Sequence, residues 1–494
     1  MTETTKRTLA ELGLAGAGYG GVAVTGLASD SREVRPGMLF AALPGVAAHG
    51  AEFAPKAVEA GAAAILTDAA GAARLKALEL PRRVPVVVAA DPREALAYAA
   101  ALWFGAQPAT LVAVTGTNGK TSVATFLRQI WEFMGLEAAN IGTTGIEGAY
   151  AAPLQHTTPD PITLHRHLAA MAAAGVTHAA MEASSHGLAQ MRLDAVRLAA
   201  AGFTNLSRDH LDYHGDEDAY FEAKAGLFER ILPDDATAVV NAADPAGGRL
   251  ESRLRSAGRR VMTVGRAPGN DLRLLGQRFD ATGQEVLFEL AGAPQGVRLE
   301  LIGGFQAENA LLAAGLAIAA GAAPDEVVRA LPALRTVRGR MELAARRANG
   351  ATVFVDYAHT PAAIETALQA LRPHVLGRLF VIIGAGGDRD RGKRPLMGEA
   401  AARHADVVFV TDDNPRSEDP AAIRAAVMAG CPGATEIADR AEAILRAVDT
   451  LGPGDALLVA GKGHETGQVI GGTVFPFDDV EQASLAVAAL EGRP

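Results

Sequence analysis

The segment 114–122, VTGTNGKTS, contains the residue types that bind phosphate groups. Its glycines let backbone N–H groups approach anionic oxygens, Lys120 supplies a positive charge, and the Thr121 hydroxyl is a suitable ligand for Mg²⁺. The standard GxxxxGK[ST] spacing would place a glycine where Val114 stands, so the spacing differs from that pattern. A purely structural turn is the alternative, but Gly-Lys-Thr between a strand and a helix has few structural uses. The segment therefore predicts a phosphate-binding loop.

Further residues that could act on a phosphate follow downstream. Glu182 ends a predicted strand at 177–182, where its carboxylate can help to hold a magnesium ion that bridges two phosphates. A solvated loop carboxylate is the alternative. His210 and Lys224 lie in an acid- and histidine-rich segment, and these polar residues could equally cap the helix that carries Lys224. Phosphate binding alone does not identify a reaction, because kinases, hydrolases, motors and ligases share it.

The elements that must position these residues alternate between strands and helices. Strand-like runs up to residue 90, a buried strand at 110–115 followed by a helix, and a restart of the same pattern at 351–357 indicate an α/β protein with mostly parallel sheets. We expect three domains: a small N-terminal α/β domain (1–90), a central P-loop ATPase-like domain with a parallel sheet (91–335) and a C-terminal Rossmann-like domain (336–494). A charged helix is expected at 217–230. Ligands of such sheets bind at the carboxyl ends of strands, so we expect the chemistry between domains.

Composition sets limits on function. The chain has 494 residues and a formal charge of −10, so it should repel nucleic acid and anionic lipid as a whole. Its single cysteine, Cys431, has no internal disulfide partner and belongs to no zinc-ligand pattern. The apolar stretch 310–323 is too short to span a membrane, and the N-terminus lacks the pattern of a secretory signal. We expect a cytoplasmic monomer that acts on small molecules, with neither nucleic acid nor membrane insertion.

Ordered motifs along nearly the whole chain resemble those of the Mur ligases. They are DSR (30–32), GTNGKT (116–121), TTP (157–159), MEASSHGL (181–188), FTNLSRDHLDYHG (203–215), AK (223–224), GRME (339–342), VDYAHTP (355–361), GGDRDRGKRPLM (386–397), DDNPR (412–416) and GKGHE (461–465). The family's short phosphate-binding loop accounts for the absent glycine. Within the family, the members that add diaminopimelate are the most similar.

The resemblance implies an ATP-dependent amide ligase of peptidoglycan precursor synthesis. It would add meso-diaminopimelate to UDP-N-acetylmuramoyl-L-alanyl-D-glutamate through an acyl phosphate. A carboxylate is a poor electrophile, because its charge repels an amine and oxide is a poor leaving group, and phosphorylation removes both obstacles. The three expected domains would bind UDP, ATP and the incoming amino acid, in chain order.

The resemblance also implies the residues that bind ATP and magnesium. The ATP-binding residues would be Gly116, Thr117, Asn118, Gly119, Lys120, Thr121, Ser122, Asn309, Arg340 and His359. The catalytic residues would be Lys120, Glu182, His210 and Lys224, and the magnesium ligands Thr121, Glu182, His210 and Lys224 as its carbamate. A carbamate offers Mg²⁺ an anionic oxygen, whereas an ammonium group is repelled by the metal. An unmodified Lys224 that contacts phosphate or lies exposed is the alternative.

Two further sets would bind the other substrates. The UDP-sugar peptide would contact Ser29, Ser31, Thr157, Thr158, Ser184, Gln190 and Arg192. The chain departs from the family at Val46, Ala47 and Ala48, where a polar pair is usual. Diaminopimelate would contact Arg389, Asp413, Asn414, Pro415, Arg416, Gly461 and Glu465. The Arg416 guanidinium would pair with the second carboxylate, which lysine lacks, although Asn-Pro-Arg also occurs in simple surface turns.

Other functions fit parts of the sequence. A lysine-adding ligase of the same family and a folylpolyglutamate synthetase share the short loop and the lysine, but the synthetase lacks the first 90 residues. A phosphate-binding regulatory or motor module would turn over nucleotide without an amino acid. The segment 384–389, GAGGDR, is similar to a dinucleotide-binding fingerprint of an oxidoreductase, but Arg389 stands in place of its third glycine.

Overall fold

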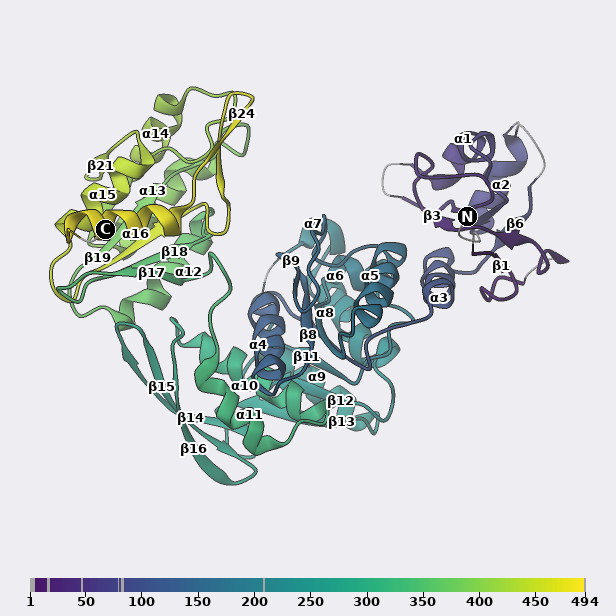
Figure 1. Cartoon of the computed structure of the whole chain (residues 1–494), viewed down its shortest axis with the longest axis horizontal. Helices are drawn as coiled ribbons and strands as arrows, with labels where there is room; N and C mark the ends of the chain where they lie inside the picture. Colours follow the sequence, from purple (N-terminus) through teal and green to yellow (C-terminus); the bar gives the residue numbers. More distant parts are fainter. Residues whose placement is uncertain are drawn as a thin grey trace. The chain divides into compact units, whose positions relative to one another are not determined.

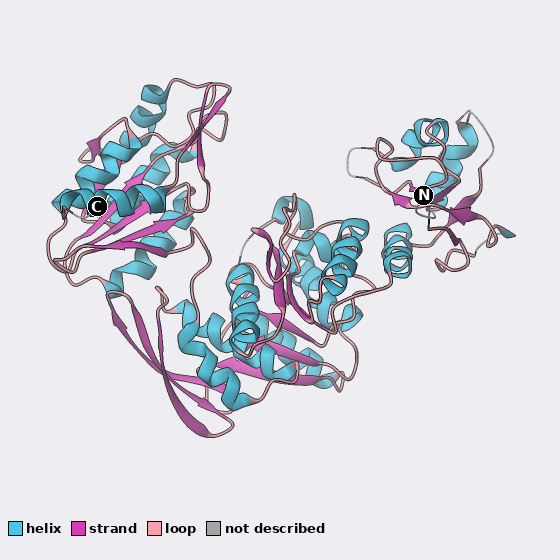
Figure 2. Ribbon diagram, viewed as in Figure 1, coloured by secondary structure: helices cyan, strands magenta, loops and turns pink. Residues whose placement is uncertain are grey.

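The computed structural model describes residues 5–15, 18–45, 48–78, 80, 84–207 and 209–492. The chain divides into two compact units, one formed by Met1–Leu272 and Leu311–Val327 and the other by Arg273–Ala310 and Val328–Pro494. Figure 1 labels the helices and strands of both units, and Figure 2 colours them by type. The domain boundaries expected near residues 90 and 335 stay predictions. In the described part of the chain, no helix combines the length and the apolar composition that a membrane span needs.

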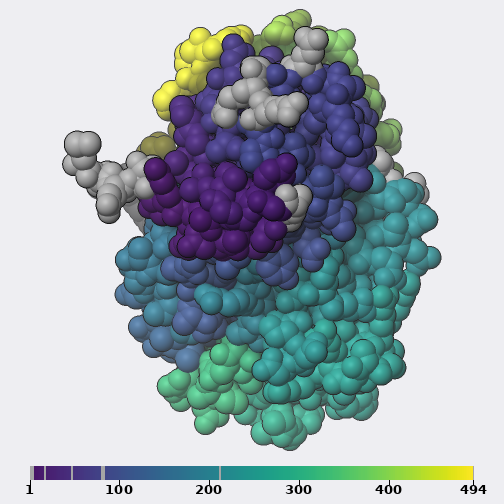
Figure 3. Space-filling model, turned by 90° about the vertical axis from the view of Figure 1, so that its right-hand side faces the viewer, coloured from purple at the N-terminus to yellow at the C-terminus, as the bar shows by residue number. Residues whose placement is uncertain are grey.

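The N-terminal part of the first unit contains a parallel sheet with the strand order β3-β4-β5-β6. Its elements are β1 (Arg7–Thr8), β2 (Ala23–Val24), β3 (Leu27–Ala28), β4 (Leu39–Ala41), η2 (Gly50–Phe53), α1 (Ala54–Glu59), β5 (Ala64–Thr67), α2 (Ala69–Ala77) and β6 (Val86–Val88). Leu39 and Phe40 point into different apolar clusters, because successive side chains of a strand face opposite sides of a sheet. The predicted small α/β domain is confirmed, and its outer surface is purple in Figure 3. Val46 and Ala47 lie outside the described residues.

A larger sheet forms the rest of the first unit, in the order β13-β12-β11-β7-β10-β8-β9. All neighbours are parallel except β8 and β9. Its elements are α3 (Pro92–Phe104), β7 (Thr110–Thr115), α4 (Lys120–Phe133), β8 (Ala138–Gly142), β9 (Gly145–Gly148), α5 (Pro161–Ala173), β10 (His178–Glu182), α6 (Ser185–Ala189), β11 (Ala200–Phe203), α7 (Leu211–His214), α8 (Glu217–Gly226), η3 (Leu227–Ile231), β12 (Thr237–Asn241), α9 (Pro245–Ser256) and β13 (Arg260–Gly265). The predicted parallel sheet is confirmed.

The helix expected at 217–230 ends earlier as an α-helix. From Leu227 the chain continues as the π-helical turn η3. The wider turn directs both Leu227 and Phe228 into the core, where each is fully buried. Hydrophobic spacing in the sequence does not distinguish such a turn from a continued α-helix.

The second unit contains a doubly wound sheet in the order β17-β18-β22-β19-β20-β21, parallel except for the edge strand β17. Its elements are β17 (Glu342–Arg346), β18 (Thr352–Asp356), α12 (Pro361–Leu371), η5 (Arg372–His374), β19 (Leu379–Ile383), α13 (Lys393–His404), β20 (Val407–Val410), α14 (Pro420–Met428), β21 (Thr435–Glu436), α15 (Arg440–Thr450), β22 (Ala456–Ala460), β23 (Gly467–Ile470), β24 (Thr473–Pro476) and α16 (Asp479–Leu490).

Alternate residues of these strands face two separate cores. Val381 packs into the cluster that contains residues of α12, α13 and α14, whereas Phe380 and Ile382 pack into the cluster built with α15 and α16. Both faces of the sheet are therefore covered by helices, as Figure 2 shows. This arrangement confirms the predicted Rossmann-like C-terminal fold.

Antiparallel strands also occur in the second unit, where only strand–helix alternation was expected. The strands β15 (Gly283–Leu290) and β16 (Ala293–Leu299) pair antiparallel, and β14 (Leu272–Asp280) is the neighbour of β15 in the sheet. The remaining elements, α10 (Phe305–Ala319), α11 (Pro324–Ala330) and η4 (Leu331–Ala333), follow them along the chain, and residues Leu311–Val327 of this stretch belong to the first unit. Side chains of β15 such as Leu287 are half exposed, so these strands lack the continuous apolar run that identifies a buried strand in a sequence.

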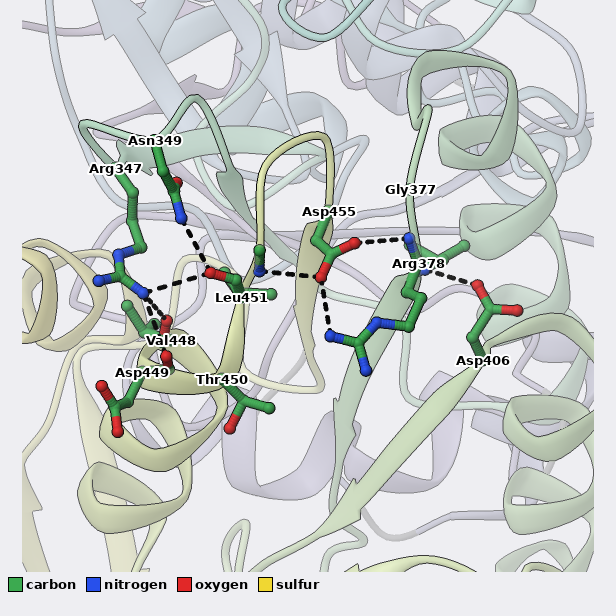
Figure 4. A network of polar contacts seen from close by, with 12 residues as sticks. Arg347, Asn349, Gly377, Arg378, Asp406, Val448, Asp449, Thr450, Leu451 and Asp455 are labelled. Atoms are coloured by element: carbon green, nitrogen blue, oxygen red, sulfur yellow. Dashed lines mark hydrogen bonds and ion pairs between the residues drawn. The ribbon is translucent and has the colours of Figure 1, made fainter.

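A polar network joins the amino-terminal ends of the parallel strands in the second unit (Figure 4). The buried Asp455 carboxylate, just before β22, accepts hydrogen bonds from the backbone N–H groups of Arg378 at 2.7 Å and Gly452 at 2.9 Å, and from the Arg378 guanidinium at 3.2 Å. Burial opposes its ionisation, but these bonds dominate and hold the pKa of Asp455 below its usual value. The network fixes the starts of β19 and β22, opposite the carboxyl ends where ligands bind such sheets.

We predict that Asp455→Ala lowers the free energy of unfolding by about 2 kcal/mol, because buried N–H donors lose their acceptor. Urea titration at neutral pH measures the change. Asp449→Ala is a matched control, because the side chain of Asp449 is exposed and only its backbone oxygen joins the network. The control should change stability by less than about 0.5 kcal/mol. Equal stability of Asp455→Ala and the unchanged protein would contradict the role given to this carboxylate.

Candidate active site

The phosphate-binding loop predicted from the sequence connects β7 to α4 in the first unit. Gly119 caps α4 in the left-handed conformation, with φ 85°, and Lys120, Thr121 and Ser122 form the first turn of the helix. The N–H groups of this first turn are available to an anion, and the helix dipole favours negative charge there. Gly116 has φ 144°, and a Cβ at this position would lie 1.9 Å from the Thr204 hydroxyl. Only glycine fits there.

The end of β11 holds the loop in shape. The Thr117 N–H donates to the Asn205 carbonyl at 2.8 Å, and the Asn118 N–H donates to the Asn205 side chain at 3.0 Å. The Thr204 hydroxyl donates to the Asn118 carbonyl at 2.6 Å. These bonds connect the FTNL segment to the loop, so the loop backbone is fixed before any ligand binds.

Two lysines from distant parts of the chain meet at one carbonyl oxygen of this loop. Lys120 Nζ lies 3.0 Å from the Gly116 oxygen and 2.8 Å from the Thr117 oxygen, and Lys224 Nζ lies 2.7 Å from the same Gly116 oxygen. Lys224 is 1% exposed, and its Nζ atom lies 4.4 Å from the centre of the Tyr220 ring. An anion bound at the loop would therefore lie beside two lysine side chains.

The surroundings shift the pKa of both lysines downward. Burial lowers the pKa of Lys120, although the carboxylates of Glu182 and Asp209 oppose this shift. Burial, and then the positive charge of Lys120, lower the pKa of Lys224 to about 6, against the opposing effect of Asp209. Lys224 is therefore largely an uncharged amine at neutral pH.

Glu182 ends β10 beside the loop. Its backbone pairs with Val114 of β7, and its side chain is 2% exposed. The carboxylate accepts a hydrogen bond from the Thr143 N–H at 2.8 Å and from the Thr143 hydroxyl at 3.3 Å. A Cβ at Gly142 would lie 2.0 Å from its Oε1 atom, so this glycine makes room for the carboxylate.

His210 belongs to a cluster of aromatic rings and histidines next to Lys224. It has a positive φ of 53°, its ring centre lies 4.8 Å from that of His186 and 6.3 Å from that of Tyr220, and its Nε2 atom lies 3.4 Å from an oxygen of Asp209. The Tyr220 hydroxyl lies 3.3 Å from the Thr117 hydroxyl. Tyr220 thus places the cluster in contact with the phosphate-binding loop. Among the described residues, no three His, Cys, Asp or Glu side chains gather closely enough to hold a metal ion by themselves.

Most residues predicted to bind the UDP-sugar peptide form one hydrogen-bonded group near Glu182. The Thr158 hydroxyl donates to the Glu182 carbonyl at 2.9 Å and accepts from the Ser184 N–H at 3.0 Å. Arg192 donates to the Thr158 carbonyl at 2.6 Å and to the Gln190 side chain at 2.7 Å. Burial lowers the pKa of Arg192.

The other predicted contacts of this substrate have different surroundings. The Thr157 hydroxyl lies 3.1 Å from that of Thr143. Ser29 is exposed and Ser31 is partly exposed, in the turn that follows β3 of the N-terminal sheet. These two serines are available to a ligand.

Six of the seven residues predicted to bind diaminopimelate, all except Pro415, line one pocket of the second unit, with a volume of about 210 Å³. Its lining is Tyr357, His359, Gly384, Ala385, Gly386, Arg389, Lys393, Asp413, Asn414, Arg416, Gly461 and Glu465. Pro415 lies in the same turn, and its carbonyl oxygen would be 1.9 Å from a Cβ at Gly387. The pocket lies at the carboxyl ends of β18, β19, β20 and β22, as expected for such a sheet.

The pocket contains side chains of both charges. The Asn414 amide donates to the Glu465 carboxylate at 2.9 Å, and the Arg416 guanidinium donates to the Gly387 carbonyl at 2.8 Å. Lys393 Nζ donates to the His359 carbonyl at 3.0 Å. Burial is the main cause that lowers the pKa of Lys393, while acidic neighbours oppose it. A ligand with both amino and carboxylate groups fits this pattern.

The three remaining ATP-binding candidates lie in the second unit. Asn309, on α10, is 7% exposed and donates to the Gln306 side chain at 3.0 Å. The Arg340 guanidinium lies 4.8 Å from the centre of the Tyr357 ring. His359, predicted to bind ATP, lines the same pocket as the predicted amino-acid contacts. The roles of these three residues toward ATP stay predictions.

Several residues of these sites were not predicted from the sequence. Tyr357 and Lys393 line the pocket, and Thr143 and Tyr220 contact the groups around the loop. The first two stand inside the VDYAHTP and GGDRDRGKRPLM motifs, so these motifs could have indicated that both residues lie near the site. Nothing local in the sequence connects Thr143 to Glu182, because the contact depends on the pairing of β8 with β10.

Three family models match this chain. The Mur ligase middle domain matches residues 114–317, and the domain described as Mur ligase, glutamate ligase domain matches residues 339–463. The model described as Mur ligase family, catalytic domain matches residues 23–103. Together these models account for most of the chain.

Individual proteins are similar over nearly its full length. The UDP-N-acetylmuramoyl-L-alanyl-D-glutamate--2,6-diaminopimelate ligase of Brucella melitensis is 51% identical over 471 residues, which cover 95% of each chain. A solved structure with the same name has a TM-score of 0.76 at 33% identity and covers 99% of this chain and 100% of its own. The folylpolyglutamate synthase of Mycobacterium tuberculosis complexed with ADP has a TM-score of 0.59 at 21% identity and covers 75% of this chain and 92% of its own, a likeness of fold alone.

We predict that stability depends on pH through Lys224. Its pKa is about 6 in the folded protein, against 10.5 for an ordinary lysine side chain, so between these pH values the unfolded chain binds more protons than the folded one. The free energy of unfolding should therefore rise with pH across this window. Lys224→Met removes this contribution, so its unfolding free energy should rise less steeply between about pH 6.5 and about pH 8.5.

Urea unfolding in bicarbonate-free buffer measures both slopes, because bicarbonate could modify the amine. Lys76→Met is a suitable control, because Lys76 is exposed on α2 and should leave the slope unchanged. Identical slopes for Lys224→Met and the unchanged protein would show that the Lys224 amine is charged in both states.

Proposed function

Because the chain belongs to the Mur ligase family, we propose that it is an ATP-dependent ligase that adds meso-diaminopimelate to UDP-N-acetylmuramoyl-L-alanyl-D-glutamate. The observation that carries the proposal is the pocket of the second unit, which presents Arg389 and Arg416 together with Asp413 and Glu465. Two amino groups and two carboxylates on one small molecule match these charges. The 51% identical relative, whose name gives this reaction, supports the assignment.

The first step is phosphorylation of the D-glutamyl carboxylate. A carboxylate oxygen attacks the γ-phosphorus of ATP, and the bond from that phosphorus to the β-bridging oxygen breaks to release ADP. Charge develops on the transferring group and on the leaving oxygen, where Lys120 and the N–H groups that begin α4 stabilise it. The product is an acyl phosphate, whose carbonyl carbon is now electrophilic.

The second step forms the amide. The neutral amine of diaminopimelate attacks the carbonyl carbon, and the bond from carbon to the phosphate oxygen breaks, so phosphate leaves with the electron pair. The amine nitrogen loses one proton as the amide forms. Asp413 and Glu465 would orient the amino groups of the ligand, and two guanidinium groups would hold its carboxylates.

Magnesium fits the groups beside the loop. The Glu182 carboxylate and the Thr121 hydroxyl are oxygen donors of the kind that Mg²⁺ prefers, and phosphate oxygens of ATP would supply further ligands. We assign these two residues to one magnesium ion, and His210 and Lys224 to a second. The metal would neutralise phosphate charge during transfer.

We also propose that Lys224 acts as its carbamate. The amine is buried and largely uncharged at neutral pH, because its pKa is about 6, and only an uncharged amine can attack CO₂. Attack forms an N–C bond, the nitrogen loses one proton, and the product carries an anionic oxygen. That anion would be attracted to the neighbouring Lys120 ammonium, whereas an ammonium at position 224 is repelled by it.

A labelling experiment tests this modification. After incubation with ¹³C-bicarbonate at neutral pH, the folded protein should give a carbamate carbon signal by NMR, and Lys224→Arg should not, because a guanidinium does not react with CO₂. Loss of the signal on denaturation would show that the fold maintains it. A signal of equal intensity in Lys224→Arg would contradict the assignment to this residue.

The UDP-sugar peptide is assigned to the first unit. Thr157, Thr158, Ser184, Gln190 and Arg192 would hold the muramoyl peptide near Glu182, and the bonds among Thr158, Ser184 and Arg192 support this group as a preformed site. Ser29 and Ser31 would contact the uridine side. The UDP-sugar peptide is a nucleotide of cytoplasmic metabolism, so we propose that the enzyme is cytoplasmic. We also propose that it acts as a monomer.

Arg416 is proposed to select diaminopimelate over lysine. Lysine has one carboxylate, so it would leave one guanidinium of the pocket without a partner, which weakens binding by more than the loss of the contact alone. A lysine-adding ligase of the same family remains the second candidate, since it would use the same ATP-binding loop. A folylpolyglutamate synthetase is the third candidate, and the solved example matches 75% of this chain.

Phosphate release from ATP tests the proposed function. With UDP-N-acetylmuramoyl-L-alanyl-D-glutamate present, we predict fast release when meso-diaminopimelate is added, and at least about 100-fold slower release with L-lysine or with no amino acid. Product mass identifies the amide. Faster turnover with lysine would support the lysine-adding alternative, and release that ignores the amino acid would indicate a nucleotide hydrolase without ligase chemistry.

A further inference from the structure

A lysine that does not line the amino-acid pocket lies directly behind it. Lys462, within the GKGHE segment, is fully buried at 0% exposed. Its Nζ donates to the Asn414 side-chain oxygen at 2.9 Å and to the Gly467 carbonyl at 2.7 Å, and it lies 3.9 Å from the Glu465 carboxylate. A buried ammonium group is unfavourable unless it is well paired, so these three contacts hold Lys462 in one position.

The contact with Lys462 fixes the orientation of the Asn414 amide. Its oxygen accepts from Lys462 and from the Val469 N–H at 2.9 Å, so its NH₂ group must point the other way, to the Glu465 carboxylate at 2.9 Å. A flipped amide would place NH₂ donors against two other donors. Lys462 and the Val469 N–H together therefore determine which Asn414 atom points to the Glu465 carboxylate, and of the two only Lys462 also lies near that carboxylate.

The same lysine joins the pocket to strand β23. Gly467, which accepts from Lys462, is the first residue of this strand. Farther along, Gln468 donates to the Asp413 carbonyl at 2.7 Å, and the Val469 carbonyl accepts from the Arg416 N–H at 3.0 Å.

Arg416 needs such support from its neighbours. Its φ is 51°, a left-handed conformation that is unfavourable for a residue with a side chain. Its carbonyl accepts from the Gly471 N–H at 2.7 Å, and its own N–H is bonded to Val469. The backbone bonds from the β23 hairpin therefore hold the Arg416 guanidinium at its place in the pocket.

We propose that Lys462 is a positioning residue for amino-acid selectivity. Its ammonium group joins Asn414 to the start of β23, and so sets the separation between the Glu465 carboxylate and the Arg416 guanidinium. That separation decides whether a ligand with a second amino-acid head binds better than one with a simple amine. The inference rests on the proposed function, because it assigns diaminopimelate to this pocket.

The variant Lys462→Met tests the inference in the full-length protein, since methionine keeps an unbranched buried chain without the charge. We expect KM for diaminopimelate to rise about tenfold, kcat at saturation to stay within about twofold, and KM for ATP and for the UDP-sugar peptide to stay unchanged. The preference for diaminopimelate over L-lysine should fall about tenfold. Arg416→Ala serves as a reference that removes the guanidinium itself, and Lys76→Met serves as the control for loss of an exposed lysine.

The possible results separate the inference from the proposed function. If the unchanged protein does not use diaminopimelate, the proposed function fails and the inference fails with it. If the unchanged protein uses it, and folded Lys462→Met keeps the same KM and the same preference, the inference alone fails. An equal loss of kcat with every substrate would also contradict it, because that result indicates general damage to the fold.

A second variant covers the case in which Lys462→Met does not fold, as judged by its thermal unfolding transition. Gln468→Ala removes the bond to the Asp413 carbonyl without placing a new group in the core. We expect KM for diaminopimelate to rise about threefold, with a parallel loss of preference over lysine and unchanged kcat. An unchanged KM in this variant would then overturn the proposal.

Discussion

The convergence of Lys120 and Lys224 on the Gly116 carbonyl is the interaction on which the first unit depends. Burial lowers the pKa of both lysines, and repulsion by the nearby Lys120 charge lowers the pKa of Lys224 further. A polyphosphate, or a negative charge placed on Lys224, removes that repulsion. The loop is therefore stable with one positive charge and becomes a strong anion site once a ligand supplies the opposite charge.

In the second unit, the two ends of the parallel sheet differ in structure. At the starts of β19 and β22, Asp455 and its partners close the backbone into a fixed network. At the opposite ends of the strands, some backbone positions have an unfavourable conformation, and others leave no room for a Cβ atom. Arg416 has a left-handed backbone, and a Cβ at Gly461 would lie 2.5 Å from the Asp413 carboxylate. Stability at one end permits strain at the other, where the ligand contacts are formed.

The sequence predicted those features that depend on local spacing. The phosphate-binding loop between β7 and α4 follows from the order of a buried strand, glycines, a lysine and a threonine, and the confirmed sheets follow from runs of apolar residues. The grouping of Arg389, Asp413 and Glu465 in one pocket also agrees with motifs that follow parallel strands.

Features that depend on long-range packing could not be predicted in the same way. Lys462 appears in the sequence as an ordinary charged residue between two glycines, yet its burial depends on β23 packing against the Asn414 turn. Thr143 contacts Glu182 only because β8 and β10 are neighbours in the sheet. The π-helical turn after α8 gives no distinct spacing of apolar residues. The role of each residue depends on partners that are distant in sequence.

Formation of an acyl phosphate is the central chemical claim, and oxygen transfer measures it most directly. The D-glutamyl carboxylate of the UDP-sugar peptide is labelled with ¹⁸O, the protein is supplied with ATP and meso-diaminopimelate, and the released phosphate is examined by mass spectrometry. The account predicts one ¹⁸O atom in each phosphate released, because a carboxylate oxygen leaves with the phosphoryl group when the amide forms. Amide formation with unlabelled phosphate would contradict it.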